Sequence, residues 1–443
     1  MAEETTRSKP LQKILLIALA VLIFIAIVAV GLYRLSSSSR LNQQLADLRS
    51  RGLPTNGAEL NAYYAVPSNV RDTTEQWTVA INGVVVANIG SKAQGIPFVG
   101  EGPTPVPPLG QEWAELEASR SFLKELDHEI QLIKQAADAG GMARYPVDFT
   151  AGYNTILPAQ QETRTLARLL SLSAHVNAHD GKNPETLRDA SAIFAVSESL
   201  RGDPILISQL IRIAIHASGC ELVADVLPYG HWTDTELENL QITIGRADFR
   251  SGMQMALHGE LALSLDAIDR FPYPHSMFRG ANKIKAIELL SKSTMGLETS
   301  WPEALMSLQK ADAELKALAA SKFSRLTYAT LIPLLPAYQQ FIHAGIRAEA
   351  RQNCAIATIA AYRFRFQHGK LPTSLPDLQD LIPDDDPSKS SRLIDPFDGQ
   401  PLRFKANSDS VIIYSIGENK VDDGGDFDNE RPRDGDLGYL ISE

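Results

Sequence analysis

Cysteine is scarce in this chain, and several familiar catalytic motifs are missing from it. Only two cysteines, Cys220 and Cys354, occur among 443 residues, which excludes a disulfide-dense scaffold and a zinc site of four cysteines. The chain also lacks the Gly-x-Ser-x-Gly elbow of serine hydrolases and the Gly-x-x-x-x-Gly-Lys-[Ser/Thr] phosphate loop. A disulfide between Cys220 and Cys354 is the alternative in an oxidising compartment, but nothing in the sequence brings them together, and we expect two lone buried thiols. None of these motifs assigns a catalytic residue.

An excess of positive charge is missing as well. The chain has 42 lysines and arginines against 53 acids, a formal net charge of −11. A nucleic-acid binder would show a basic balance, so we expect no nucleic-acid partner. Hydrophobic residues make up 44% and charged residues 21%. These values are those of an ordinary globular chain, and they exclude wholesale disorder and a polytopic membrane protein.

Long apolar segments are limited to a single run, Ile14 to Tyr33, which contains 20 uncharged residues between Lys13 and Arg34. A helix of that length spans about 30 Å, the thickness of a bilayer core. A buried core helix and a cleaved signal peptide are the alternatives, but a signal peptide has an apolar region of about 7–15 residues. We predict a transmembrane anchor over 14–34, preceded by a short tail over 1–13.

The basic residues around this run do not decide its orientation, because both sides carry several. A short basic tail directly before an apolar run is typical of a signal anchor. We therefore expect the tail in the cytoplasm and the body on the periplasmic side of a cell inner membrane, with the membrane as a partner.

Residues 35–110 are predicted to be a membrane-proximal region and linker. Ser36 to Ser39 is expected to be a flexible exit from the membrane. The run Thr73 to Ala87 is rich in β-branched residues and contains Asn82-Gly83, which favours a β-hairpin. Five prolines and five glycines follow between Ile89 and Gly110 and indicate a loop.

Residues 111–344 have the pattern of a helical domain, with apolar residues recurring at a period near 3.6. Asn183-Pro184 and Asp203-Pro204 each place a capping residue before a proline. Thr233 to Glu236 and Ser300 to Glu303 match the capping box. We predict about eight helices in an antiparallel bundle; an α-solenoid is the weaker alternative, because no fixed-period repeat is found.

The composition changes after His368-Gly369, and residues 345–443 are predicted to form a separate C-terminal domain. Residues 402–404 and 411–416 are typical of two strands of a small antiparallel sheet, packed against a helix over 355–366. The predicted fold class is therefore mainly α, with a transmembrane helix, a multi-helix bundle and a small α+β module.

The last 26 residues, from Glu418, contain nine acids and three bases. Oxygen-rich loops with glycine suit Ca²⁺, which binds about 6–8 oxygens. A solvated acidic tail is the alternative. An EF-hand is excluded, because acids at loop positions 1, 3 and 5 are never combined with Gly at 6 and Glu at 12.

Three segments of the C-terminal part resemble a known family. The helix and turn over 355–372, the turn Asp-Pro-Phe-Asp-Gly-Gln-Pro over 395–401, and Tyr-Ser-Ile-Gly-Glu-Asn-Lys-Val-Asp-Asp-Gly-Gly over 414–425 follow one another with matching order and spacing. Together they resemble the globular part of the major pseudopilin of type II secretion systems. The resemblance covers residues 346–443, about a fifth of the chain, and no family is recognised for 111–340.

The resemblance implies a small sheet beside a helix, with Ca²⁺ ordering the final loop. Asn419, Asp423 and Asp436 stand near the family's metal ligands, together with the backbone oxygen of Ile416. Asn419 replaces an aspartate of the family, which removes one charge. The other acids of the loop are further candidates without a clear counterpart: Asp422, Asp426 and Asp428.

The N-terminal end departs from that family. A pseudopilin begins with a peptidase site of Gly-Phe-Thr-x-x-Glu type before its apolar helix, whereas Lys9 to Lys13 precede the helix here. The chain is therefore not expected to be processed or packed as an ordinary pseudopilus subunit.

Two histidines at a metal-binding spacing are the remaining candidates for a site. His175 and His179 lie one helical turn apart, followed by Asp180. Val176 stands where a zincin has its glutamate, and no third ligand is identifiable. We interpret the pair as helix-surface histidines rather than a metal site.

These observations predict a non-enzymatic, single-pass envelope protein with a helical binding or scaffold body, an unidentified protein partner, and a Ca²⁺-stabilised end. The first alternative is a periplasmic hydrolase, for which His175, His179 and Asp180 would converge with another ligand in a pocket. The second is an atypical component of a secretion apparatus.

Overall fold

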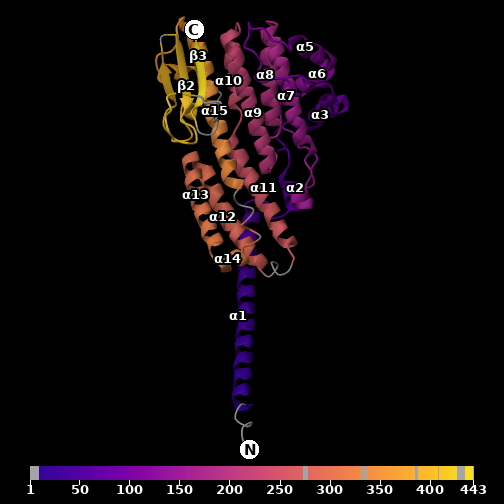
Figure 1. Cartoon of the computed structure of the whole chain (residues 1–443), viewed down its shortest axis with the longest axis vertical. Coiled ribbons are helices and arrows are strands. Elements are labelled where there is room, and N and C mark those ends of the chain that lie inside the picture. The colour runs from indigo at the N-terminus through magenta and orange to yellow at the C-terminus, as the bar shows by residue number, and fades with distance from the viewer. Residues whose placement is uncertain are drawn as a thin grey trace, which may run out of the picture.

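The chain forms a long N-terminal helix that leads into a helical body, with a small sheet at the far end of that body (Figure 1). The computed structural model describes residues 9–272, 278–329, 331–332, 337–384, 388–407, 409–426 and 435–442. The described part is mainly helical, with one three-stranded antiparallel sheet near the C-terminus. The prediction of a mainly α fold with a small C-terminal sheet is confirmed.

Helix α1 runs without a break over Lys9–Ser50, and its lower part projects from the body (Figure 1). Ser36 to Ser39 are helical, so the predicted flexible exit is wrong. The helix continues because the next turns pack: Leu48 is buried, and Arg40 forms an ion pair with Glu288 at 2.5 Å.

Most side chains of the predicted anchor over 14–34 lie outside the described residues. Within the described part of the chain, no helix combines the length and the apolar character that a membrane span needs. The anchor therefore stays a prediction.

The predicted hairpin over 73–87 is wrong, because this segment is helix α3, Thr74–Ala87. Trp77, Ala80, Ile81 and Val84 are all buried, and their spacing is that of one helix face. Packing of this face against the helices over Asp127–Ala139 and Pro158–His179 outweighs the strand preference of the β-branched residues.

The body contains more helices than the eight or so predicted. Neighbouring helices along the chain, such as α7 with α8 and α12 with α13, pack against each other. The α-helices not yet given are α2 Gly57–Tyr63, α4 Ile89–Lys92, α5 Leu116–Glu125, α6 Asp127–Ala139, α7 Pro158–His179, α8 Asn183–Ser199, α9 Leu206–Val226, α10 Asp234–Gly245, α11 Phe249–Arg270, α12 Arg279–Thr299, α13 Trp301–Ala320, α14 Lys322–Thr327 and α15 Ala337–His368. The 3₁₀ helices are η1 Phe149–Asn154, η2 Leu227–Tyr229, η4 Leu375–Leu381 and η5 Lys389–Ser391.

The predicted helix starts are half correct. Thr233 forms the expected capping box with Glu236, and Ser300 accepts a hydrogen bond from the amide of Glu303. Asn183 is instead the first residue of α8. Asp203 lies before the start of α9, where it is buried and accepts a hydrogen bond from Gln160 Nε2 at 2.6 Å. The Asp203 side chain therefore binds Gln160 of another helix instead of capping the start of α9.

The sheet has the strand order β1-β2-β3, with strands Arg403–Ala406, Ser410–Ser415 and Leu437–Ser442. Both pairs are antiparallel, and Ser415 pairs with Leu437. Strand β3 was not predicted individually, because it follows an acidic stretch that obscures it.

Helix α15 crosses the predicted boundary at 344/345 and contacts both the sheet and the body. Buried residues Ile356 and Ile413 belong to the same hydrophobic core as Leu170 of α7. The sheet and the upper body therefore share one core.

Candidate functional site

The predicted metal loop begins where β2 ends, and a buried aspartate anchors this point. Asp395, from the resembling turn over 395–401, accepts hydrogen bonds from the Ile416 amide and from Ser415 Oγ, both at 2.9 Å. Burial raises the pKa of Asp395, and these donors offset part of that cost. The resembling turn thus fixes the first residue of the loop.

Three carboxylates of the predicted set interact across this loop: Asp422, Asp423 and Asp436. Asp436 Oδ2 accepts a hydrogen bond from the Gly425 amide at 2.8 Å. Burial raises the pKa of Asp436, and the charges of Asp423 and Asp422 raise it further. Asp436 Oδ1 is buried and has no hydrogen-bond partner within the described residues. A cation would relieve both the repulsion and the unpaired oxygen.

The other predicted ligands are held by the loop itself. Asn419 Nδ2 donates to Asp423 Oδ2 at 3.1 Å, and Asn419 Oδ1 accepts from the Val421 amide. Asp422 Oδ1 accepts from Tyr414 Oη at 2.9 Å. Asp426 is exposed, and no described contact joins it to the other acids. The further candidate Asp428 lies outside the described residues.

The candidate metal-ligand atoms of this loop are all oxygens, which suits Ca²⁺. The unpaired Asp436 Oδ1 is also a ligand that a hard cation prefers. Within the described ranges, however, no three His, Cys, Asp or Glu side chains form a group that could hold a metal ion. Calcium binding by Asp422, Asp423, Asp436, Asn419 and the Ile416 carbonyl therefore stays a proposal.

The two histidines of α7 contact aromatic rings and backbone oxygens. His175 is buried, donates from Nδ1 to the Ser171 carbonyl at 2.8 Å, and stacks on Phe98. His179 Nε2 lies 3.2 Å from the Pro107 carbonyl oxygen, and burial lowers the pKa of this histidine. The interpretation as surface histidines is wrong for His175, which belongs to the core.

Asp180 pairs with Arg120 and Lys182. It does not form a metal group with the two histidines in the described structure. The convergence on which the hydrolase alternative depends is therefore not found in this part of the chain.

The two thiols are free and buried, as expected. Burial raises the pKa of Cys220 to about 12, and it raises the pKa of Cys354 as well. Both groups are therefore protonated at neutral pH and unsuited to nucleophilic chemistry.

A cleft of about 460 Å³ that the sequence did not indicate lies where α3, α6, α8 and α10 meet. Its apolar walls include Trp77 and Phe194, and its polar lining includes Arg188, Arg201 and Arg246. We call it the arginine cleft. Its volume is within the range of small-molecule sites.

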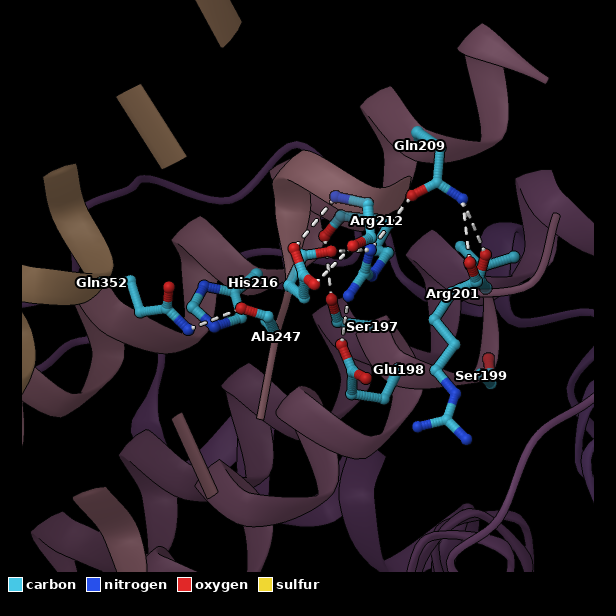
Figure 2. A network of polar contacts seen from close by, with 12 residues as sticks. Ser197, Glu198, Ser199, Arg201, Gln209, Arg212, His216, Ala247 and Gln352 are labelled. Carbon is cyan, nitrogen blue, oxygen red and sulfur yellow. Dashed lines mark hydrogen bonds and ion pairs between the residues drawn. The ribbon is translucent and has the colours of Figure 1, made fainter. Parts of the chain in front are cut away.

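A buried polar network supports one side of the arginine cleft (Figure 2). Arg212 of α9 is 1% exposed, and its guanidinium contacts Glu198 Oε1 at 2.7 Å and Gln209 Oε1 at 3.2 Å. Gln209 Nε2 donates to the carbonyls of Leu200 and Asp203 at 3.0 and 2.8 Å. These bonds hold the turn between α8 and α9, which carries Arg201.

Sequence reasoning missed this region because its residues match no motif. The one available signal was Arg212, a charged residue in the otherwise apolar segment 210–215. A lone arginine in such a segment indicates a buried ion pair, but its partner Glu198 lies on the preceding helix.

Comparison with known proteins assigns no family to the chain. No protein-family model, curated protein or solved structure gives a match. The resemblance of residues 346–443 to a pseudopilin therefore stays an interpretation of those residues.

Proposed function

We propose that this chain is a single-pass membrane-anchored envelope protein, with a helical binding or scaffold body and a Ca²⁺-stabilised pseudopilin-like end. The proposal rests chiefly on the projecting part of α1, where the large apolar side chains of known placement are 51–66% exposed. These side chains are Ile14, Ile17, Leu19, Val21 and Phe24.

Exposure on this scale is unfavourable in water. Burying one such side chain contributes about 1.5–3 kcal/mol, so the five together favour transfer into an apolar environment by several kcal/mol. The surrounding run over 14–33 has the length of a bilayer core, about 30 Å. A lipid bilayer therefore suits this segment better than water does.

The connection between this segment and the body supports a close approach to the membrane surface. Helix α1 has no break between the apolar run and Leu48, which lies in the core with residues of α11 and α12. The sheet and the helices around the arginine cleft lie at the end of the body away from α1 (Figure 1). We propose that this end faces away from the membrane, on the periplasmic side.

Alkaline carbonate extraction of cell membranes tests the anchor. The full chain is expected to remain in the membrane pellet. The double variant Val21→Lys with Phe24→Lys should move to the supernatant, because a lysine near a helix centre costs about 2.5–3.5 kcal/mol of insertion. The matched control, Asn42→Lys with Gln43→Lys, changes exposed positions of the same helix and should stay in the pellet.

Release of the unaltered chain by carbonate would contradict the proposal. The side of the membrane is tested separately with a reporter fused after Glu443. Activity of that reporter in the cytoplasm would reverse the proposed orientation.

A further inference from the structure

We propose that the arginine cleft binds a small organic anion, namely a carboxylate or phosphate group carried on an aromatic or aliphatic body. The inference is independent of the membrane anchor and of the Ca²⁺ loop. It combines three features of the described residues: arginines without a protein partner, an apolar wall beside them, and a rigid support.

The charges of the cleft favour an anion. Arg188 pairs with Asp138 at 2.7 Å. Glu198 also lines the cleft, and it is already paired with Arg212, which does not line the cleft. The guanidinium groups of Arg201 and Arg246 have no ion-pair or hydrogen-bond partner in the described part of the chain. Two planar donors are therefore available for the oxygens of a ligand.

This local surplus contrasts with the acidic balance of the whole chain, whose net charge is −11. The lining contains three arginines and two acids, and both acids are engaged with arginine. A site that served a cation would leave a carboxylate unpaired instead. The arrangement therefore selects negative ligands against the charge of the protein as a whole.

The apolar wall defines the remainder of the ligand. The half-buried Ala137 and Ala195 expose apolar surface to the cleft, which the buried Trp77 and Phe194 also line. A bare inorganic anion would not use this surface. An aromatic or aliphatic body would contact this surface, and its transfer from water would contribute to the binding free energy.

Hydrogen bonds hold the backbone of Arg201 in place. Its amide donates to the Glu198 carbonyl at 3.1 Å, and its carbonyl accepts from Gln209. Ser199, two residues earlier, is held by a 2.8 Å hydrogen bond between its Oγ and Tyr145 Oη. Figure 2 shows the Arg201 side chain extending from this supported turn, with its guanidinium away from the network. A backbone that is already fixed lowers the loss of conformational entropy when the Arg201 side chain binds a ligand.

The test uses the full-length chain in detergent and four probes: phenyl phosphate, phenylacetate, inorganic phosphate and the neutral phenylacetamide. Binding is measured by calorimetry. We expect at least one of the two aromatic anions to saturate below about 1 mM. That anion should bind at least tenfold more tightly than both phenylacetamide and inorganic phosphate. The ratio of the two aromatic anions distinguishes a phosphate site from a carboxylate site.

Variants connect the binding to the arginine cleft. Arg201→Gln should weaken the preferred aromatic anion at least tenfold, and Arg201→Lys should recover part of the loss, because it keeps the charge without the fork. The matched control is Arg168→Gln, which removes an exposed arginine of α7 that has no described partner. It should change the affinity less than twofold.

Circular dichroism and melting temperature verify that each variant is folded. Equal affinity for the neutral amide, equal effects of the Arg201 and Arg168 variants, or no saturable binding of either aromatic anion would overturn the proposal. If Arg201→Gln fails to fold, Arg246→Gln replaces it, and unchanged binding by that variant would count equally against the site.

Discussion

Replacing Arg212 with leucine tests the buried network beneath the arginine cleft. The Arg212 side chain is 2% exposed, and its guanidinium contacts Glu198, Gln209 and the Asp248 carbonyl. Leucine removes all three contacts and leaves the Glu198 carboxylate, 15% exposed, without its partner. Breaking a buried ion pair from one side typically costs about 3–5 kcal/mol. We expect a loss of unfolding free energy in this range.

Urea unfolding of the full chain, followed by circular dichroism, measures the effect. Arg212→Lys should be intermediate, because lysine keeps the charge but cannot reach several acceptors at once. Arg168→Leu, at an exposed site without a described partner, should stay within about 0.5 kcal/mol of the original. A double-mutant cycle with Glu198→Gln isolates the pair. A loss below about 1 kcal/mol for Arg212→Leu would refute the reasoning.

Two further predictions concern the acids of the loop and the core. Millimolar Ca²⁺ should raise the melting temperature more than Mg²⁺ does. Asp436→Asn should abolish most of this shift, and Asp426→Asn, at an exposed position, should abolish little of it. Equal shifts with both ions would mean that the loop is only a solvated acidic segment. Burial raises the pKa of Glu260 to about 7, above its unfolded value, so this group lowers stability as the pH rises from about 4.5 through 7. Glu260→Gln keeps an acceptor for the Leu206 amide and should therefore stabilise the protein at pH 8 by about 2–3 kcal/mol more than at pH 5; thermal melts that show the same gain at both pH values would exclude this origin.

Local signals along the chain were reliable where the interaction itself is local. The capping box at Thr233 forms as expected, and Ser300 caps α13, because each interaction involves residues within one turn. Asp203 shows the opposite case. Its sequence context predicts a cap, but the long-range hydrogen bond from Gln160 determines its position.

Two elements were misread because composition and packing disagree. Segment 74–87 is rich in β-branched residues, yet it is helical because Trp77 and Ile81 bury one face against α6 and α7. Strand β3 follows a strongly acidic stretch, yet Leu437 and Ile441 are buried and pair with β2. In both cases burial outweighs average composition, which a sequence window cannot evaluate.

The candidate metal site was also only partly predictable from the sequence. Asp423 and Asp436 were found from the sequence through the resemblance to a known motif, and Asp422 was found as a further acid beside Asp423. Their mutual repulsion and the unpaired Asp436 oxygen became visible only when β3 brought residue 436 back beside Gly425.

The sequence by itself determined the mainly helical class, the single long apolar run, the acidic balance and the oxygen-rich loop, because these depend on composition and short-range spacing. Only the tertiary structure brought Trp77, Arg188, Arg201 and Arg246 around one cleft and joined Arg212 to Glu198. These residues come from separate helices. Their meeting depends on how the helix faces pack, and the contacts that decide it connect positions too far apart along the chain to leave a local pattern.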